Sequence, residues 1–475
     1  MNKYTKIVAT ISNHRCEVDF VRELFEAGMS VVRMNTAHLD FEGLDKIVNN
    51  VRQVSDDIAF LVDTKGPEIR TTTSDADITL KADQKIILAG NSTEKTTSEI
   101  INVSYNNIVE DVNINSEILI DDGELALLVE SKDNTKLYCK VLNDGVLGSR
   151  KSVNVPGVRI NLPSLTEKDI ANIGYAIDKD LDFIAHSFVR NAQDVKDIQK
   201  MLDAKNSKIK IIAKIENQEG VENIDEILEV AYGVMIARGD LGIEIPQEKI
   251  PFIQRLLIRK CVESKKPVIV ATQMLHSMIK SPRPTRAEVT DVANAIYYRT
   301  DAIMLSGETA YGNYPVEAVT TMAEIAKEVE LAKDSRNDIP VDLVKHDITA
   351  YLADTAVKAS KEIDIKVVLT DSLTGKTARY LAAFRGTIPV VALCYNKRVG
   401  RELALSYGVF PYLAENGSSK GEIIHNSLMM LKEKGILVDT DQIAYLGGSF
   451  GIGGGTTFLE IITVEELLNK TVKAL

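Results

Sequence analysis

Short apolar runs that alternate with helical patterns constrain the fold of this 475-residue chain more than any other feature. The runs are rich in β-branched residues and apolar almost throughout, which is typical of strands buried on both faces of a parallel sheet. The expected strands are Ile7–Ile11, Val31–Asn35, Ala59–Asp63, Phe183–Val189, Lys210–Ile215, Gly233–Ala237, Pro267–Thr272 and Ala302–Leu305.

The helical patterns between these runs carry apolar side chains on one face. In the first pattern, Phe20, Leu24 and Ala27 share a face. The expected helices are Asp19–Ala27, Leu165–Asp180, Ala192–Ala204, Lys249–Ser264 and Val316–Ala332. Alternation repeated this often predicts an α/β fold, a (β/α)8 TIM barrel that we assign to residues 1–67 and 157–338.

A β-rich stretch interrupts the alternation after the third strand. Between about residues 67 and 157, Thr, Ile and Val alternate with polar residues, and turn signals such as Asp122-Gly123 and Asp133-Asn134 recur. This pattern predicts hairpins. We therefore expect residues 68–156 to form a small β domain inserted in a loop of the barrel.

A third domain is expected over residues 339–475. The polar stretch Lys333–Pro340 is typical of a linker. The elements expected after it are a helix at Asp347–Ile363, a strand at Ile365–Thr370, a helix at Gly375–Phe384 and a strand at Pro389–Leu393. The sequence therefore predicts a C-terminal α/β domain.

Composition excludes several classes of function. The 68 Asp and Glu residues outnumber the 56 Lys and Arg residues, for a net charge of −12. This balance argues against binding to nucleic acid or an anionic membrane, which requires a basic surface. No apolar run approaches the ~20 residues of a membrane-spanning helix, and the polar N-terminal stretch is unlike a signal peptide.

The cysteines indicate the compartment. There are four, and no two are close in sequence: Cys16, Cys139, Cys261 and Cys394. This spacing argues against a metal cluster or a disulfide framework. We expect reduced thiols in a cytoplasmic protein.

Charged side chains follow the early strands at their carboxyl ends, where (β/α)8 barrels carry their active sites. Arg33 suits a phosphate or carboxylate, because its guanidinium binds two oxygens at once, although a surface salt bridge would explain it too. The third strand ends in a Gly-Pro turn with Asp63, Lys65, Glu68 and Arg70, a set that a solvated turn could also carry.

Lys214 and Glu216 lie two positions apart at the end of the fifth strand, so their side chains point the same way. Burial is costly for both unless they pair with each other or with a ligand. Asp240 follows a glycine after the sixth strand, on the neighbouring strand end. Two carboxylates completed by substrate oxygens and water are how Mg²⁺ is usually held, although any acidic rim could supply the pair.

Hydroxyl groups and a further acid end the last two strands. Thr272 could bind substrate or serve only in packing. Ser306 and Glu308 could form a proton relay, or Ser306 could cap the next helix. The stretch from Thr285 to Glu288 fits the T-x-x-E capping box, which is a structural role.

The order of these motifs resembles that of the pyruvate kinase family over nearly the whole chain. The most specific stretch is IIAKIENQEGV at Ile211–Val221. The motifs that follow the family's order are VRMNTAH, LVDTKGPEIRT, LGSRKSVNVPG, MIARGDLGIEIP, ATQML, PTRAEVTDVANA and MLSGETA. The resemblance implies phosphoryl transfer from phosphoenolpyruvate to ADP, giving pyruvate and ATP in the last step of glycolysis.

The resemblance also implies roles for single residues. Lys214 would stabilise the transferred phosphoryl group, Arg33 would hold the substrate phosphate, and Glu216 and Asp240 would ligate Mg²⁺ or Mn²⁺. The implied substrate contacts are Ala237, Arg238, Gly239, Asp240 and Thr272, with backbone donors facing the substrate carboxylate. The enolate would be protonated by water relayed through Thr272, Ser306 or Glu308.

The implied nucleotide contacts are Asn35, His38, Arg70 and Lys151. Lys151 belongs to the inserted domain, which by resemblance is a small β-barrel lid that expels water when closed.

A K⁺ site is implied at Asn35, Asp63 and Thr64. Family members usually carry a serine at the position of Ala37, which offers no hydroxyl here. The neighbouring Thr36 would point away in a continuing strand, so that water would fill the gap. Glu68 is the residue type of K⁺-requiring members. We therefore expect stimulation by K⁺.

The C-terminal domain resembles the family's regulatory domain. The segment Gly375-Lys376-Thr377 is not a P-loop, because position 370 holds Thr rather than Gly. The implied contacts to a phosphorylated effector are Thr370, Ser372, Thr374, Lys376 and Thr377, with a second loop at residues 447–457. Arg286 resembles a subunit-interface residue, and the family is usually homotetrameric.

Two other readings of the sequence remain open. The first is another Mg²⁺-dependent barrel enzyme acting on pyruvate-like substrates, such as an aldol lyase, which would need neither the inserted domain nor Lys151. The second is a non-catalytic relative that senses a metabolite. The presence of Lys214, Glu216 and Asp240 disfavours the second reading.

Overall fold

Eight parallel strands close into a barrel in this computed structural model, which describes residues 3–332, 347–417, 419–448 and 455–473. The strands are β1 (Lys6–Thr10), β2 (Val31–Asn35), β3 (Ala59–Asp63), β13 (Phe183–His186), β14 (Lys210–Ile215), β15 (Gly233–Ala237), β16 (Val268–Ala271) and β17 (Ala302–Leu305). Neighbouring strands pair in chain order, and β17 pairs with β1. The predicted (β/α)8 barrel is confirmed.

Helices surround this barrel and supply its outer core. They are α1 (Val18–Ala27), α2 (Phe41–Val54), α4 (Glu167–Asp178), α5 (Ala192–Ala204), α6 (Gln218–Glu222), α7 (Ile224–Val230), α8 (Arg238–Glu244), α9 (Ile250–Glu263), α10 (Arg286–Tyr297), α11 (Gly307–Ala310) and α12 (Pro315–Ala332), with 3₁₀ turns η1 (Gln247–Lys249) and η2 (His276–Ile279). The predicted capping box at the start of α10 is confirmed, because Thr285 and Glu288 each bond the other's backbone.

The inserted domain lies between β3 and α4 and is built almost entirely of strands. Its elements are β4 (Ile69–Arg70), β5 (Ile78–Leu80), β6 (Lys85–Gly90), β7 (Ile100–Val103), α3 (Ile108–Asp111), β8 (Glu117–Ile120), β9 (Leu125–Lys132), β10 (Leu137–Val141), β11 (Gly145–Leu147) and β12 (Ser152–Asn154). Its main sheet has the order β4-β12-β8-β9-β10-β6-β7. A bridge from Thr71 to Val103 joins the two ends, so the sheet is barrel-like, as expected.

The C-terminal domain is a five-stranded sheet with helices. Its elements are α13 (Ile348–Glu362), β18 (Val367–Ser372), α14 (Lys376–Phe384), β19 (Val390–Cys394), α15 (Lys397–Glu402), η4 (Leu403–Leu405), β20 (Val409–Leu413), α16 (Lys420–Glu433), β21 (Gln442–Gly447), β22 (Phe458–Thr463) and α17 (Val464–Lys473). The strand expected at Ile365–Thr370 is β18, two residues further along, so Thr370 and Ser372 lie on a strand. The predicted linker at Lys333–Pro340 lies outside the described residues.

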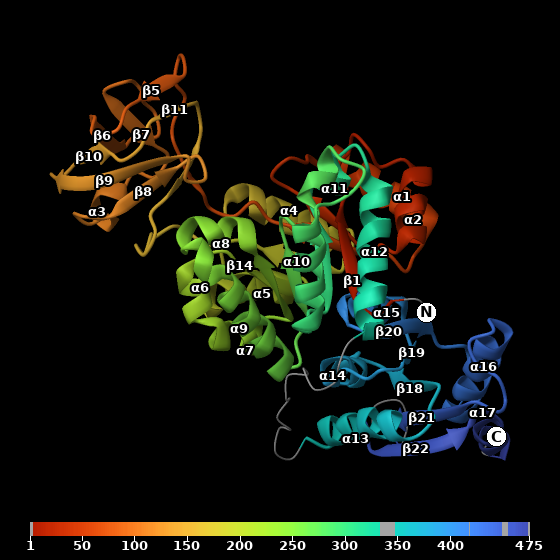
Figure 1. Ribbon diagram of the computed structural model, residues 1–475. Helices are drawn as coiled ribbons and strands as arrows, with labels where there is room; N and C mark the ends of the chain where they lie inside the picture. Colours follow the sequence, from red (N-terminus) through yellow and green to blue (C-terminus); the bar gives the residue numbers. More distant parts are fainter. Residues whose placement is uncertain (1–2, 333–346, 418, 449–454, 474–475) are drawn as a thin grey trace.

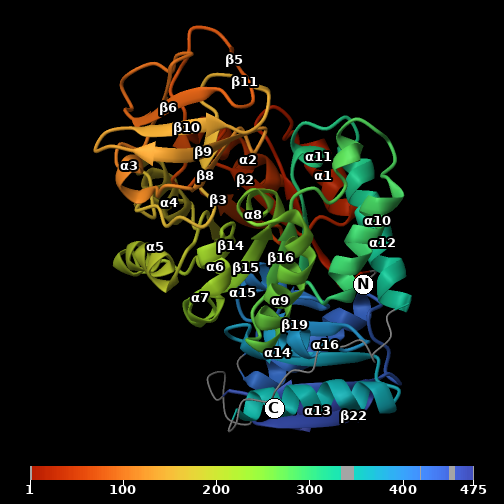
Figure 2. The same cartoon turned by 60° about the vertical axis from the view of Figure 1, so that its left-hand side comes forward.

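The inserted and C-terminal domains lie at opposite ends of the barrel (Figures 1 and 2). At the amino-terminal ends of the strands, Ala404 and Leu405 of η4 pack into the barrel interior with Val8 and Leu61. The other end, formed by the carboxyl ends of the strands, faces the inserted domain. The C-terminal domain therefore closes the barrel floor and leaves the mouth to the inserted domain.

All four cysteines are buried and unpaired, as expected. Over the described part of the chain, no helix combines the length and apolar character that crossing a membrane requires.

Lys6 is buried where β1 meets the C-terminal domain. Its Nζ atom donates to the carbonyl oxygen of Val409 at 2.5 Å and lies 4.7 Å from the centre of the Phe410 ring. Burial lowers the pKa of Lys6 to about 7, with a further lowering by Lys3 and an opposing effect of Glu330. In the unfolded chain, Lys6 has an ordinary lysine pKa. Between about pH 7 and pH 10, Lys6 is therefore protonated in the unfolded chain and neutral in the folded one.

We expect Lys6→Met to be more stable than the parent at pH 7, with a difference that shrinks as the pH rises toward 10. The cost of burying a protonated lysine is full below the folded pKa and disappears above the unfolded pKa. Thermal unfolding of both proteins at each pH measures the difference, and the parent cancels the titration of all other groups. A difference that stays constant between pH 7 and pH 10 would contradict this account of Lys6.

Candidate active site

Lys214 lies at the centre of a buried ionic cluster at the carboxyl ends of the barrel strands. Its Nζ atom is 2.9 Å from Glu216 Oε1 and 3.1 Å from Asp63 Oδ1. It also donates to Ser187 Oγ at 2.6 Å. The closed barrel brings these side chains together from β14, β3 and the end of β13.

Asp63 connects this lysine to Arg33. Arg33 Nε lies 2.6 Å from Asp63 Oδ2, and its Nη1 donates to Thr10 Oγ1 at 3.0 Å. Asp63 is only 1% exposed, so its two oxygens each hold a cation with almost no water nearby. The strand pairing puts Arg33, Asp63 and Lys214 on one side of the mouth, where the positive charges of Arg33 and Lys214 can face a common anion.

The charged side chains of this cluster shift one another's pKa values. Burial lowers the pKa of Lys214, but Asp63, Glu216 and Asp240 outweigh burial, so that the pKa lies above its ordinary value. Burial raises the pKa of Asp63, yet Lys214 and Arg33 lower it by more. The lysine is therefore an ammonium ion and Asp63 a carboxylate at neutral pH.

Glu216 and Asp240 are close enough to affect each other. Burial raises the pKa of Glu216, Lys214 lowers it, and Asp240 raises it again, with a net upward shift. The second oxygen of Glu216 accepts the amide hydrogen of Phe188 at 2.7 Å, and Phe188 adopts a left-handed φ of 57° to present it. Two crowded carboxylates are an oxygen donor set that fits a hard divalent cation.

Asp240 lies in the first turn of α8 rather than on the strand end that the sequence suggested. Beside it, Thr272 Oγ1 accepts the amide hydrogen of Gly239 at 2.8 Å. Thr272 has a φ of 68°, a conformation that costs a β-branched residue energy and is typical of functional sites. The Arg238 guanidinium pairs with Asp291 on α10, at 2.6 Å, and also donates to the Thr272 carbonyl at 2.7 Å.

Glu308 forms hydrogen bonds with Ser306 and with the segment that follows β16. Glu308 is 2% exposed and accepts the amide hydrogens of Ser306, at 2.8 Å, and Leu275, at 3.2 Å. Ser306 stands at the N-cap position of α11, but its side chain makes no capping hydrogen bond there.

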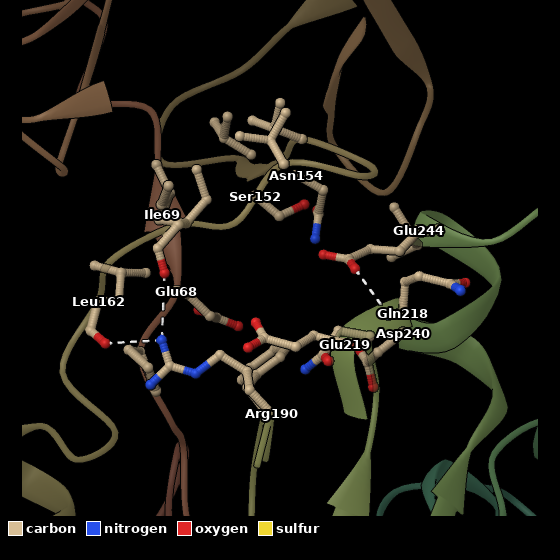
Figure 3. Close-up of a pocket in the computed structure, with 18 of the residues that line it drawn as sticks. Glu68, Ile69, Ser152, Asn154, Leu162, Arg190, Gln218, Glu219, Asp240 and Glu244 are labelled. Atoms are coloured by element: carbon tan, nitrogen blue, oxygen red, sulfur yellow. Dashed lines mark hydrogen bonds between the residues drawn. The ribbon is translucent and has the colours of Figure 1, made fainter. Parts of the chain in front are cut away.

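A cavity of about 780 Å³ separates the inserted domain from the barrel mouth. Arg70, Asp121 and Lys151 line it from the inserted domain, and Asp240 and Glu244 line it from the barrel. Lys151 Nζ is 2.7 Å from Asp121 Oδ2, and the Arg70 guanidinium pairs with Glu68. Figure 3 shows Glu244 facing Asn154 and Ser152 across this space. Burial raises the pKa of Glu244 to about 7.

The residues expected around K⁺ lie along the ends of β2 and β3. Asn35 Oδ1 accepts the amide hydrogen of Ala37 at 3.1 Å. The Thr64 carbonyl accepts from Ser187 Oγ at 2.7 Å. Thr36 is fully buried and donates its hydroxyl to the Asp63 carbonyl at 2.7 Å, so it does not replace the missing hydroxyl of residue 37. The His38 side chain is exposed.

The expected effector residues gather around the start of α14. Ser372 Oγ accepts the amide hydrogen of Gly375 at 2.9 Å, and Thr377 shares a hydrogen bond with Thr456 at 2.6 Å. Lys376 Nζ lies 3.5 Å from Asp347 Oδ2. Thr370 lies within β18, and Thr374 accepts from Arg379 through its carbonyl. The second loop at residues 447–457 is described only at its two ends.

Sequence reasoning missed three contacts of this site. Ser187 bonds Lys214, Thr10 bonds Arg33 and Asp121 pairs with Lys151. Ser187 was hidden because the run through Val189 looked like one strand, whereas β13 ends at His186. Asp121 stands in a hairpin turn, where an Asp has a sufficient structural explanation.

Family comparisons agree with the fold and with the motif order. Residues 2–319 match the family described as pyruvate kinase, barrel domain. Residues 351–462 match the family described as pyruvate kinase, alpha/beta domain.

Single relatives match almost end to end. A pyruvate kinase of Borreliella burgdorferi is 46% identical over 98% of this chain and 99% of its own length. A pyruvate kinase of Bacillus licheniformis is 44% identical over 98% of this chain and 81% of its own. The crystal structure of a pyruvate kinase from Cryptosporidium parvum aligns with a TM-score of 0.91 and 36% identity over 98% of this chain and 96% of that one.

We expect Asp63→Asn to destabilise the barrel strongly, because Arg33 and Lys214 would lose their shared counter-charge in a nearly dry site. A buried charge left without its partner costs about 3–5 kcal/mol. Differential scanning calorimetry measures the effect. Asp291→Asn is the matched control, since it removes the partner of Arg238 at a more exposed position. Equal shifts of the unfolding midpoint in the two variants would show that the Asp63 pairs carry no special weight.

Proposed function

The chain belongs to the pyruvate kinase family, whose reaction moves a phosphoryl group from phosphoenolpyruvate to ADP, and we propose that Arg33, Lys214, Glu216 and Asp240 carry out this transfer at the barrel mouth. The observation that carries the proposal is the buried Lys214 ammonium, held between Asp63 and Glu216. This arrangement provides fixed positive charge beside a pair of carboxylates suited to a divalent cation.

Lys214 stabilises the phosphoryl group while it is being transferred. In phosphoryl transfer, negative charge spreads over the equatorial oxygens of the moving group, so preorganised cations lower the barrier. Asp63 holds the lysine in place before substrate arrives, which removes the cost of orienting it during reaction. Arg33, held by the other oxygen of Asp63, binds the substrate phosphate through its remaining donors.

Glu216 and Asp240 would hold Mg²⁺ or Mn²⁺. Burial, and after it the charge of Asp240, raises the pKa of Glu216, and a bound cation would offset both effects. A bound divalent ion would neutralise charge on the substrate's carboxylate and phosphate. By the family resemblance, backbone amides of Ala237–Gly239 would orient the carboxylate. The amide of Gly239 donates to Thr272 Oγ1, which leaves this role to Ala237 and Arg238.

Loss of the phosphoryl group leaves an enolate that needs a proton. Thr272, Ser306 and Glu308 follow β16 and β17 in the chain and would form the polar side of the mouth there. A water ordered by the Thr272 hydroxyl would deliver the proton, with the Ser306–Glu308 pair as its relay. Gly239, bonded to Thr272 Oγ1, keeps this hydroxyl aligned.

Arg70 and Lys151 would bind the phosphates of ADP from the inserted domain, with Asn35 and His38 on the barrel side. Arg70 and Lys151, unlike Asn35 and His38, line the 780 Å³ cavity, whose size is one that ligand sites commonly have. The acids that hold the two lid cations, Glu68 and Asp121, would release them to the nucleotide. Closure of the inserted domain would then exclude water from the transfer.

Regulation and assembly extend the proposal. The effector residues Thr370, Ser372, Thr374, Lys376 and Thr377 would bind a phosphorylated ligand at the start of α14. A cytoplasmic homotetramer with Arg286 near a subunit interface is consistent with the family. The cavity argues against the aldol-lyase alternative, because such an enzyme does not need basic side chains like Arg70 and Lys151 in the cavity that Asp240 also lines.

A coupled assay for pyruvate, from phosphoenolpyruvate and ADP, tests this function directly. We expect Lys214→Met to reduce kcat by about 10³-fold, the effect of removing a fixed group that stabilises transition-state charge. Calorimetric binding of phosphoenolpyruvate should weaken far less, since the lysine matters most as charge develops. Lys210→Met, at the opposite end of β14, is the control. Equal losses of binding and turnover in Lys214→Met would indicate a structural lysine.

Omission of the divalent ion from the same assay should abolish turnover by the parent protein.

K⁺ stimulation is a separate prediction. We expect added K⁺ to raise kcat, and Ala37→Ser to lower the K⁺ concentration for half-maximal activity, because serine adds the hydroxyl that residue 37 lacks. Ala37→Val adds bulk without a hydroxyl and serves as the control. Activity that ignores K⁺ in the parent, or a half-maximal concentration that Ala37→Ser leaves unchanged, would contradict the proposed site.

A further inference from the structure

Two connectors join the inserted domain to the barrel. The outgoing connector runs from Asp63, at the end of β3, to Ile69 at the start of β4. The returning connector runs from Asn154, at the end of β12, to Thr166, the N-cap of α4. Movement of the domain relative to the barrel must be absorbed within these two segments.

Asp169 holds both connectors with one carboxylate. The residue is fully buried. Its Oδ1 atom accepts the amide hydrogens of Lys65, at 2.9 Å, and Gly66, at 3.4 Å, on the outgoing connector. Its Oδ2 atom accepts from the amide and the hydroxyl of Thr166, at 3.0 and 2.6 Å, at the end of the returning connector. A capping box needs only the Thr166 bonds, so the contacts to Lys65 and Gly66 are additional.

The outgoing connector also packs directly on the residues that orient the catalytic cluster. Gly66 has a φ of 71°, and a Cβ atom there would lie 2.8 Å from both Ser187 Cβ and Phe188 Cδ2. Ser187 Oγ accepts from Lys214, and the Phe188 amide donates to Glu216. A shift of Gly66 therefore pushes on the two residues that position the lysine and the carboxylate.

Arg190 fixes the returning connector nearer the inserted domain. Its Nη1 atom donates to the carbonyls of Leu162, at 2.9 Å, and Ile160, at 3.2 Å, while Asp194 holds the guanidinium. Figure 3 shows Arg190 reaching across the cleft wall to Leu162. Ile160 and Leu162 also pack on the apolar core of the inserted domain, so Arg190 ties this part of the returning connector to the barrel.

We propose that Asp169 is a positioning residue for phosphoryl transfer, which couples the pose of the inserted domain to the Lys214–Glu216 cluster. It acts through Lys65 and Gly66 on one side and Thr166 on the other, and it touches no reacting atom. The kinetic part of this inference depends on the proposed function, whereas the structural part does not.

The variants separate the connector role from the helix cap. Asp169→Asn keeps the shape but cannot accept hydrogen bonds on both sides, because an amide has one acceptor oxygen. Thr166→Val removes the hydroxyl of the cap and leaves the bonds to Lys65 and Gly66. Glu288→Gln is a second control, since Glu288 is the acid of the capping box on α10, away from both connectors.

Distances between spin labels report the domain pose without any turnover. Labels on cysteines introduced at Asn134, in the inserted domain, and Lys196, on α5, are specific because both sites are exposed and all four native cysteines are buried. Excess unlabelled chain restricts the signal to pairs within one chain. We expect Asp169→Asn to broaden or shift the distance distribution, and both controls to leave it as in the parent.

Kinetics supply the second readout. We expect Asp169→Asn to lower kcat/KM for ADP about tenfold, the effect of losing one hydrogen bond to a charged group, with a raised KM for ADP. Thr166→Val and Glu288→Gln should leave that KM unchanged even where they lower the unfolding temperature. An unchanged distance distribution in Asp169→Asn, or equal effects of Asp169→Asn and Thr166→Val on KM and distance, would overturn the inference and reduce Asp169 to a helix cap. Failure of the proposed function would instead remove activity from the parent and leave the distance test valid.

Discussion

The buried ammonium of Lys214, paired with Asp63 and Glu216, is the interaction on which the rest of the site depends. A charge with so little access to water is tolerated only because the two carboxylates surround it. Asp63 then carries a second cation, Arg33, on its other oxygen. The electrostatic field for an anionic substrate is thus in place before the substrate binds, and the fold has already met the cost of assembling it.

The architecture serves this cluster in layers. The closed barrel brings the ends of β2, β3 and β14 together, which no open sheet would do as compactly. Leu405 of the C-terminal domain packs into the barrel at the amino-terminal ends of the strands, so the mouth, at their carboxyl ends, is the open end. The inserted domain faces that mouth across the cavity lined by Lys151 and Asp240. Its connectors meet at Asp169, and the outgoing connector lies at Gly66 against Ser187 and Phe188, which bond Lys214 and Glu216.

Much of the fold was predictable, because buried parallel strands have a strong apolar signature. The limits of Val31–Asn35, Ala59–Asp63 and Lys210–Ile215 agree with the structure to the residue. The spacing of Lys214 and Glu216 on a strand indicated that their side chains point the same way, and the structure shows that they pair with each other. The links through Ser187 and Asp169 did not, since they depend on how β13 ends and on contacts more than 100 positions apart. Local patterns carry no information on such contacts, whereas the motif order indicated the family.

A crystal structure with phosphoenolpyruvate and Mn²⁺ tests the central claim most directly, because anomalous scattering locates the metal independently of the protein atoms. The account predicts Mn²⁺ between the carboxylates of Glu216 and Asp240, with Lys214 Nζ and the Arg33 guanidinium within hydrogen-bond distance of the phosphoryl oxygens. Mn²⁺ bound elsewhere in the cleft, or a phosphoryl group out of reach of Lys214, would contradict it.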